Sequence, residues 1–181
     1  MSAPTLTAGA LLVDAAGRVL FGRRAAWKPA WPDCWDAIGG HVEPGETPEA
    51  AVVREVREEV GVTPTRLALL EVVPEARPDL YGEALHHIFA VSAWSGGEPV
   101  NGCDEHSEIR WFELAEIARL APLAGEGYRR LCELAVRGAR CAADVTSRAP
   151  LPRADGRGAA RAFPSIRRPH PTPAPPHRGE G

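Results

Sequence analysis

Three glutamates stand close together in a stretch whose spacing predicts a helix over residues 48–60. Glu55, Glu58 and Glu59 follow one another at i, i+3 and i+4, so at 100° per residue their side chains fall within one arc of the helix. Carboxylates at this spacing repel one another by roughly a few tenths of a kcal/mol per pair. A hard divalent cation with oxygen ligands offsets that repulsion, and Mg²⁺ is the natural candidate because it shares its coordination shell with water and substrate phosphates. The alternative interpretation is a solvated acidic helix face.

The residues around these glutamates follow a defined pattern. From Gly40 the chain reads GHVEPGETPEAAVVREVREEVGV. This matches the Nudix box, G-x5-E-x7-R-E-U-x-E-E-x-G-U with U aliphatic, at every defined position. Since each identity is expected roughly once in fifteen positions, chance gives about 10⁻⁸ per starting position. The identity positions are Gly40, Glu46, Arg54, Glu55, Glu58, Glu59 and Gly61. The chain thus resembles the Nudix hydrolases over about residues 5–142.

The resemblance implies an α+β Nudix fold, in which a mixed β-sheet is sandwiched between helices and the box forms a loop–helix–loop. Family members usually hydrolyse a nucleoside diphosphate linked to another group X, using Mg²⁺ or Mn²⁺ and a water that attacks phosphorus. The box suits this chemistry, because a polyanionic diphosphate repels hydroxide unless its oxygens are neutralised. The implied metal ligands are the three carboxylates, Glu55, Glu58 and Glu59, and the backbone carbonyls of Gly39 and Gly40.

One carboxylate must also orient or deprotonate the attacking water. Glu55 is the candidate for this catalytic role, with Glu105 or Glu108 on the later DEHSE segment as alternatives. In the family pattern Arg54 pairs with Glu46 across the loop–helix junction, and it is expected to orient the catalytic carboxylates.

Basic and aromatic residues before the box are candidate substrate contacts. Arg23 and Arg24 are placed to bind phosphate oxygens, the alternative being one exposed arginine and one that snorkels over apolar surface. Trp27, Trp31 and Trp35 either stack on a base or cover the edge of the core.

The resemblance leaves the substrate open between several groups. The short chain is most similar to the MutT-type branch, which cleaves (d)NTPs, including oxidised ones such as 8-oxo-dGTP, to the monophosphate and pyrophosphate. Pro78 stands where members specific for ADP-ribose often carry a proline, so ADP-ribose or another nucleotide sugar is the rival. Tyr81 stands slightly beyond a tyrosine of dinucleoside-polyphosphate members. Isopentenyl-diphosphate isomerase is excluded because Gly39 occupies the place of its catalytic cysteine. A non-catalytic ligand-sensing Nudix domain is the remaining alternative, although such domains usually lose box carboxylates.

Hydrophobic patterning predicts the elements that must position these residues. Thr47 is expected to cap the central helix, with Pro48 at its first position and Gly61 at its end. The segment over 36–42 is predicted as a short strand broken at its two glycines. The other predicted strands cover 5–14, 18–23, 66–74, 84–94 and 109–112, and two further helices cover 113–120 and 127–143.

Composition sets the wider limits. The 181 residues with 44% hydrophobic side chains predict one Nudix domain over 1–147. The segment 148–181 holds seven Arg, two acids and eight Pro, and we expect it to be a disordered tail. The four cysteines form no C-x-x-C pair, so a cytoplasmic location is the default expectation.

Charge and hydropathy limit the partners. The tail carries +5 and the rest of the chain −8, and an acidic body disfavours stable nucleic-acid binding. No apolar run reaches the ~18 residues of a membrane span, and no leader is expected at the N-terminus. The expected partner is therefore a nucleotide-type diphosphate, and a homodimer remains open.

Overall fold

The computed structural model describes residues 3–125 and 127–147. Its strands are β1 (Thr5–Val13), β2 (Val19–Arg24), β3 (Trp35–Asp36), β4 (Ile38–His41), β5 (Thr63–Pro74), β6 (Ala84–Ser95) and β7 (His106–Phe112). Its helices are α1 (Pro48–Val60), α2 (Pro78–Tyr81), α3 (Leu114–Ile117) and α4 (Tyr128–Ser147). The predicted segment 148–181 lies outside the described residues.

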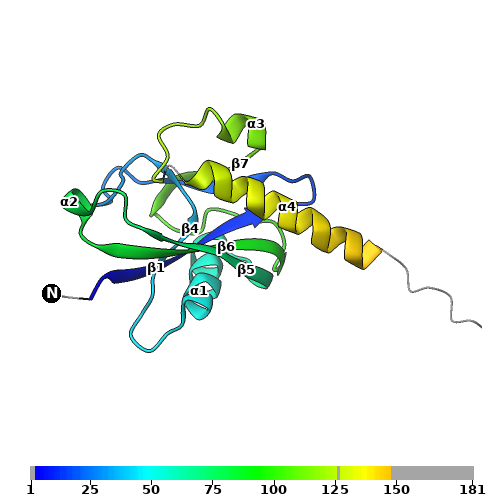
Figure 1. Ribbon diagram of the computed structural model, residues 1–181, viewed down its shortest axis with the longest axis horizontal. Helices are drawn as coiled ribbons and strands as arrows, with labels where there is room; N and C mark the ends of the chain where they lie inside the picture. Colours follow the sequence, from blue (N-terminus) through cyan, green and yellow to red (C-terminus); the bar gives the residue numbers. More distant parts are fainter. Residues whose placement is uncertain (1–2, 126, 148–181) are drawn as a thin grey trace, which may run out of the picture. The chain divides into compact units, whose positions relative to one another are not determined.

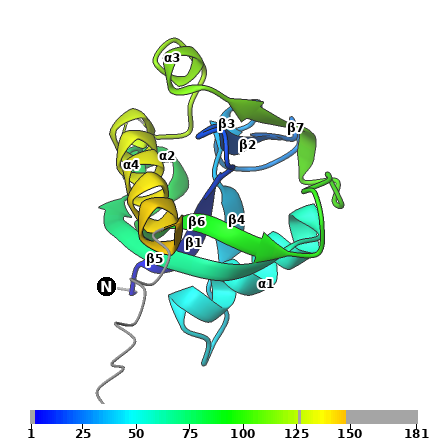
Figure 2. The same ribbon diagram turned by 90° about the vertical axis from the view of Figure 1, so that its right-hand side faces the viewer.

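The strands form one mixed sheet built around β1. Strand β1 runs parallel to β6 and antiparallel to β2 and β4, while β5 pairs antiparallel with β6, β3 with β2, and β7 with β2. Figures 1 and 2 show α1 on one side of the strands β1, β6 and β5 and α4 on the other. The predicted α+β architecture, a mixed sheet sandwiched between helices, is therefore confirmed.

Each face of the sheet has its own hydrophobic core, because side chains alternate along β1. Leu11 and Val13 belong to the core that also includes Leu131 and Val136 of α4. Ala10 and its alternating neighbours belong to the core beneath α1, with the helix valines Val52, Val56 and Val60. The apolar stripe of α1 thus fixes the rotation of the helix and determines where its glutamates point.

The ends of α1 form as the sequence predicts. The Oγ1 of Thr47 accepts a hydrogen bond from the N–H of Ala50 at 3.2 Å, and Pro48 begins the helix. Gly61 ends it with a φ of 73°, a left-handed conformation that glycine adopts without steric cost.

The predicted break at Gly39–Gly40 is wrong. Both glycines lie inside β4 and pair with Gly9 and Ala8 of β1, and the interruption falls at Ala37 instead. A Cβ on Gly39 would lie 2.0 Å from the carbonyl oxygen of Ala8. Glycine is present here because the two strands approach closely and not because the strand ends.

Other bounds also differ from the predictions. Strand β7 begins at His106 and not at residue 109, and only Leu114–Ile117 of the predicted helix 113–120 is α-helical. The single turn α2 has no counterpart among the predicted elements; Pro78 at its start fixes a helical φ. Among the described helices, none combines the length and the apolar character needed to cross a membrane. All four cysteines are free.

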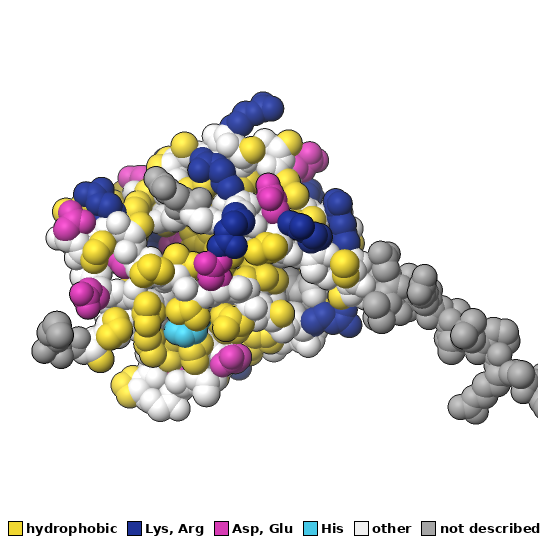
Figure 3. All heavy atoms as spheres, in the orientation of Figure 1, with side chains coloured by type: hydrophobic (Ala, Val, Ile, Leu, Met, Phe, Trp, Pro, Cys, Tyr) yellow, Lys and Arg dark blue, Asp and Glu magenta, His cyan; other side chains and the backbone are white. Residues whose placement is uncertain are grey.

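Strand β5 is the last strand on its side of the sheet. Its Leu69 and Val72 are 48% and 40% exposed, and Figure 3 shows hydrophobic side chains gathered on the face of the molecule where this strand lies. In sheet order β4 lies on the far side of β1 from β6 and β5, so this apolar edge is separate from Gly39 and Gly40.

Candidate active site

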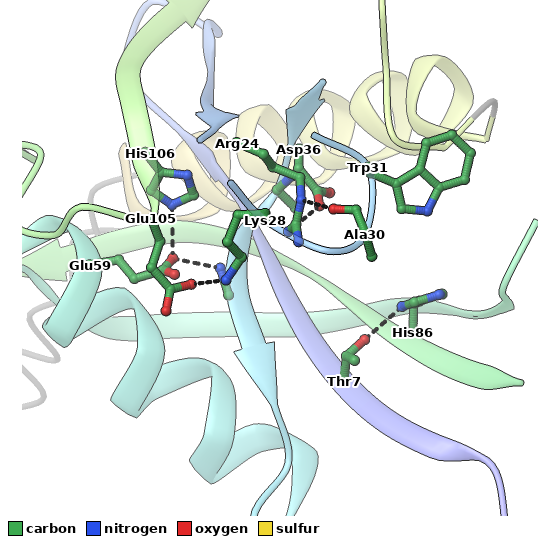
Figure 4. A network of polar contacts seen from close by, with 12 residues as sticks. Thr7, Arg24, Lys28, Ala30, Trp31, Asp36, Glu59, His86, Glu105 and His106 are labelled. Carbon is green, nitrogen blue, oxygen red and sulfur yellow. Dashed lines mark hydrogen bonds and ion pairs between the residues drawn. The ribbon is translucent and has the colours of Figure 1, made fainter. Parts of the chain in front are cut away.

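Glu59 is the most deeply buried of the three box glutamates, with 4% of its surface exposed. Its Oε2 accepts a hydrogen bond from the N–H of Gly39 at 2.9 Å and lies 3.1 Å from Nε2 of His106 (Figure 4). His106 is itself 5% exposed, and its Nδ1 has no hydrogen-bond partner among the described residues. The ring proton is therefore best placed on Nε2, where it donates to Glu59. Because both neighbours contact Oε2, the other oxygen of Glu59 is available to a ligand.

Arg54 connects the loop before α1 to the helix itself. Its Nε and Nη2 donate to the two oxygens of Glu46 at 3.1 and 3.0 Å, which is the expected pairing across the loop–helix junction. Its Nη1 reaches Glu55 at 2.7 Å and Glu58 at 3.4 Å. The hydrogen bond from Arg54 lowers the pKa of Glu46. The hydrogen bonds to Glu46 and Glu55 in turn raise the pKa of Arg54. Arg54 thus already offsets part of the carboxylate repulsion that the sequence interpretation assigned to a cation alone.

The remaining two glutamates of the arc have different environments. The side chain of Glu55 is 15% exposed, and burial raises its pKa despite the opposing hydrogen bond from Arg54. Glu58 is 54% exposed. Glu55 packs against β4, where a Cβ on Gly40 would lie 2.5 Å from its Oε1. The absence of a side chain on Gly40 therefore leaves room for this carboxylate.

The donor set fits a hard divalent cation. Glu55 and Glu59 converge from α1 on the backbone of Gly39 and Gly40 in β4, and Glu58 adds a third carboxylate on the same helix. Oxygen ligands of this kind, with room for water, are those that Mg²⁺ and Mn²⁺ prefer.

Glu105, the candidate on the later loop, forms an ion pair with Lys28 (Figure 4). The hydrogen bond from Lys28 lowers the pKa of Glu105. The close-up shows this pair beside Glu59, so a loop between β2 and β3 brings a cation to the glutamate cluster. Lys28 was not predicted as a site residue. Its only signal in the sequence is its place in a loop rich in tryptophan and proline.

The two arginines predicted to bind phosphate are placed differently from each other. Arg24 is 17% exposed; its Nη1 lies 3.1 Å from Asp36 and its Nε donates to the carbonyl of Ala30 at 2.9 Å. Arg23 is 42% exposed and lies 3.8 Å from Asp33 and 3.7 Å from Glu108. The structure thus gives Arg24 a role in holding the loop between β2 and β3, while Arg23 remains accessible to a ligand.

A pocket of about 70 Å³ opens beside this loop, with Trp31, Glu75, His86 and Tyr128 among its lining residues. The Nε1 of Trp31 donates to Glu75 at 3.4 Å, and Nε2 of His86 lies 3.2 Å from the same carboxylate. The three tryptophans before the box therefore have different environments. Trp31 lines the pocket, Trp35 is buried in the core with 8% exposure, and Trp27 is 61% exposed.

Comparison with known proteins identifies the family. The model of the NUDIX domain matches residues 3–134. The ADP-ribose pyrophosphatase of Methanocaldococcus jannaschii is 39% identical over 88 residues, which are 49% of this chain and 51% of that protein. The isopentenyl-diphosphate Delta-isomerase of Streptomyces griseus is 35% identical over 112 residues, 59% of this chain and 56% of that protein. The chain therefore spans little more than half the length of these two curated relatives.

The fold comparison agrees. The crystal structure of the MutT NUDIX hydrolase from Burkholderia pseudomallei superposes with a TM-score of 0.62 and 29% identity, covering 75% of this chain and 98% of that one. The family match over residues 3–134 includes the box, the sheet, α1 and the start of α4. The chain therefore belongs to the Nudix family with a MutT-type fold.

Proposed function

We propose that this protein is a metal-dependent pyrophosphohydrolase that cleaves the diphosphate of a nucleotide-type substrate. The observation that carries the proposal is the complete set of box carboxylates on α1, which face strand β4 where Gly40 leaves space for Glu55 and the N–H of Gly39 binds Glu59. A ligand-sensing domain has no need for this set, whereas hydrolysis of a diphosphate does.

Glu55, Glu58 and Glu59, together with the backbone of Gly39 and Gly40, would hold Mg²⁺ or Mn²⁺. When bound, the cation neutralises diphosphate oxygens and makes its water more acidic. Glu59 is fixed for this role through the hydrogen bonds to its Oε2. The partly buried position of Glu55 supports a proton-accepting role, because its raised pKa brings it nearer to neutral pH.

Glu105 is the alternative base, but Lys28 stabilises its ionised form and makes it the weaker proton acceptor. Lys28 itself, with Arg23, supplies positive charge for the phosphates. Each of them is paired with an acid, Lys28 with Glu105 and Arg23 with Glu108. Binding of substrate would exchange those partners for phosphate oxygens.

Two substrate classes are the first to test. The similarity to a MutT structure and the pocket lined by Trp31 support a (d)NTP or an oxidised dNTP, cleaved to the monophosphate and pyrophosphate. The M. jannaschii relative supports ADP-ribose, and so does the position of Pro78. Tyr81, whose ring lies 5.2 Å from that of Trp31, keeps dinucleoside polyphosphates in the panel. An isomerase reaction is disfavoured because Gly39 provides no thiol.

A nucleotide panel tests the proposal. (d)NTPs, 8-oxo-dGTP, ADP-ribose and dinucleoside polyphosphates are incubated with the full chain, and the products are separated and identified. A (d)NTP gives its monophosphate and pyrophosphate, ADP-ribose gives AMP and ribose 5-phosphate, and a dinucleoside polyphosphate gives two nucleotides. We expect turnover of at least one substrate with Mg²⁺ or Mn²⁺ and none in EDTA. Turnover that is unchanged in EDTA would contradict metal dependence, and binding without turnover across the panel would support the ligand-sensing alternative.

A further inference from the structure

A second set of metal-ligating side chains lies behind Glu59. A carboxylate oxygen of Glu59, the sulfur of Cys103 and a ring nitrogen of His106 all lie within 4.8 Å of one another. They come from three separate segments: α1, the loop after β6 and the first residue of β7. Glu59 and His106 are almost completely buried, and Cys103 is partly buried.

The group is held in place by its surroundings. The Nδ2 of Asn101 donates to the carbonyl oxygen of His106 at 2.8 Å, and the Sγ of Cys103 lies 3.9 Å from Oδ1 of the same asparagine. The imidazole of His106 packs on Gly22, where a Cβ would lie 2.5 Å from Nδ1. The loop that carries Cys103 and the imidazole of His106 are thus held in position without a bound ligand.

The chemistry of this set differs from that of the box. Mg²⁺ is bound by oxygen donors, whereas thiolate, imidazole and carboxylate together are the donors of Zn²⁺, at about 2.0–2.3 Å. Two ligands at about 2.0 Å in a tetrahedron are separated by about 3.3 Å, and Nε2 of His106 lies 3.1 Å from Oε2 of Glu59. Zn²⁺ would take the place of the proton between these two atoms.

We propose that Glu59, Cys103 and His106 form a Zn²⁺ site with an open fourth position, distinct from the oxygen-only cation site and sharing Glu59 with it. Since both cations would share the single negative charge of Glu59 and repel each other, Zn²⁺ and the cation of the box weaken each other's binding. Zn²⁺ therefore inhibits at concentrations far below that of Mg²⁺, because nitrogen and sulfur donors favour it strongly. The inhibition rests on the proposed hydrolase function, but the binding does not.

Binding is tested without any substrate. Untagged full chain is titrated with Co²⁺, a spectroscopic substitute for Zn²⁺, and separately with Zn²⁺ in a calorimeter. The wild type is compared with Cys103→Ser and with Cys141→Ser, which removes an exposed thiol from α4. We expect a thiolate-to-Co²⁺ charge-transfer band in the wild type and in Cys141→Ser, and its loss in Cys103→Ser.

Zn²⁺ affinity should fall by at least about 100-fold in Cys103→Ser, more than the 10- to 100-fold typical of losing an outer hydrogen-bond partner. Thermal unfolding in EDTA verifies that this variant is folded. A wild type without the band, or a Cys103→Ser protein that keeps both band and affinity, overturns the site.

Inhibition is then measured at fixed Mg²⁺ with the substrate found in the panel. Cys103→Ser should keep the basal rate and need about 100-fold more Zn²⁺ for half inhibition, in proportion to its affinity. Equal Zn²⁺ sensitivity of the wild type and Cys103→Ser contradicts the shared ligand. A Co²⁺ band in a protein that hydrolyses nothing refutes the proposed function and leaves the Zn²⁺ site standing, whereas hydrolysis without the band refutes only the site.

Discussion

At the scale of single residues, the two oxygens of Glu59 have different tasks. Both fixed donors, the N–H of Gly39 and Nε2 of His106, contact Oε2. Glu59→Gln removes the charge proposed to bind the cation, and kcat at saturating Mg²⁺ should fall by roughly 10²–10⁴. A carboxamide oxygen at the Oε2 position can still accept from both donors, so the Tm in EDTA should change by no more than about 2 °C.

The matched control is Glu49→Gln, at an exposed position in the first turn of the same helix. It should change neither kcat nor Tm. If Glu59→Gln unfolds the metal-free protein, its carboxylate is a structural group; if Glu49→Gln loses activity instead, the carboxylates have been assigned wrongly.

Tyr128 is a partly buried polar residue whose removal should have a measurable effect. Its hydroxyl donates to Oδ1 of Asp36, which also accepts the N–H of Ala37 at 2.8 Å. Burial, and then the charge of Asp36, raise the pKa of Tyr128 well above its ordinary value of 10. A raised pKa in the folded state gives stability that is complete below the unfolded value and is lost as the pH rises beyond it.

Tyr128→Phe should therefore lower the free energy of unfolding by about 1–3 kcal/mol near pH 8, the cost of losing a hydrogen bond to a charged group. The difference from the wild type should begin to close above pH 10. Denaturant unfolding of both proteins from pH 8 to 11 measures it. A difference that stays constant up to pH 11 would show that the hydroxyl is ionisable without cost to the fold.

At the scale of elements, strand β4 pairs with β1 in the sheet and also packs against α1. A Cβ on Gly39 would meet the backbone oxygen of Ala8 at 2.0 Å, whereas one on Gly40 would meet the movable carboxylate of Glu55 at 2.5 Å. Gly39→Ala should therefore destabilise the fold by about 3 kcal/mol or more, because strand pairing is displaced and φ is 153°.

Gly40→Ala should leave the Tm within a few degrees but lower kcat by about 10²-fold, since a catalytic group moves by the order of 1 Å. Thermal unfolding and kcat of both variants test this division. Similar stability losses in the two variants would mean that Glu55 is held too rigidly to move and belongs to the structural framework.

Local features of the sequence were sufficient to predict the ends of α1 but not the course of strand β4. Thr47, Pro48 and Gly61 act on backbone groups within one helical turn, so the helix ends were predictable from the chain itself. The glycines of β4 resemble strand breakers locally, but the neighbours that require them, Ala8 and Glu55, lie elsewhere in the chain.

Long-range contacts also explain what the site prediction missed. Lys28 and Glu105 are separated by 77 positions, and Arg24 is withdrawn from the surface through contacts with Asp36 and Ala30. Periodicity and spacing report on one element at a time, so they predicted the carboxylates of a single helix and missed the pairs between loops.

At the scale of the whole molecule, the charge is divided between two parts of the chain. Residues 1–147 carry −8 and residues 148–181 carry +5, which together give the net −3. The family match ends at residue 134, every proposed metal ligand lies between Gly39 and His106, and the proposed phosphate-binding side chains are Arg23 and Lys28. Removing 148–181 should therefore leave kcat and Tm unchanged, because it takes away no residue of the site or of the two cores.

The Michaelis constant should respond to this truncation in a salt-dependent way. A body of −8 repels a polyanionic nucleotide more than the full chain does, so KM should rise a few-fold at low ionic strength. At about 0.15 M salt the screening length is near 8 Å and the difference should vanish. A full-length variant with the seven Arg of 148–181 replaced by Gln should reproduce the KM shift, because the effect depends on charge alone. Loss of kcat or Tm on truncation would show that the tail packs against the Nudix domain, and a KM shift that persists at high salt would show that it contacts the substrate directly.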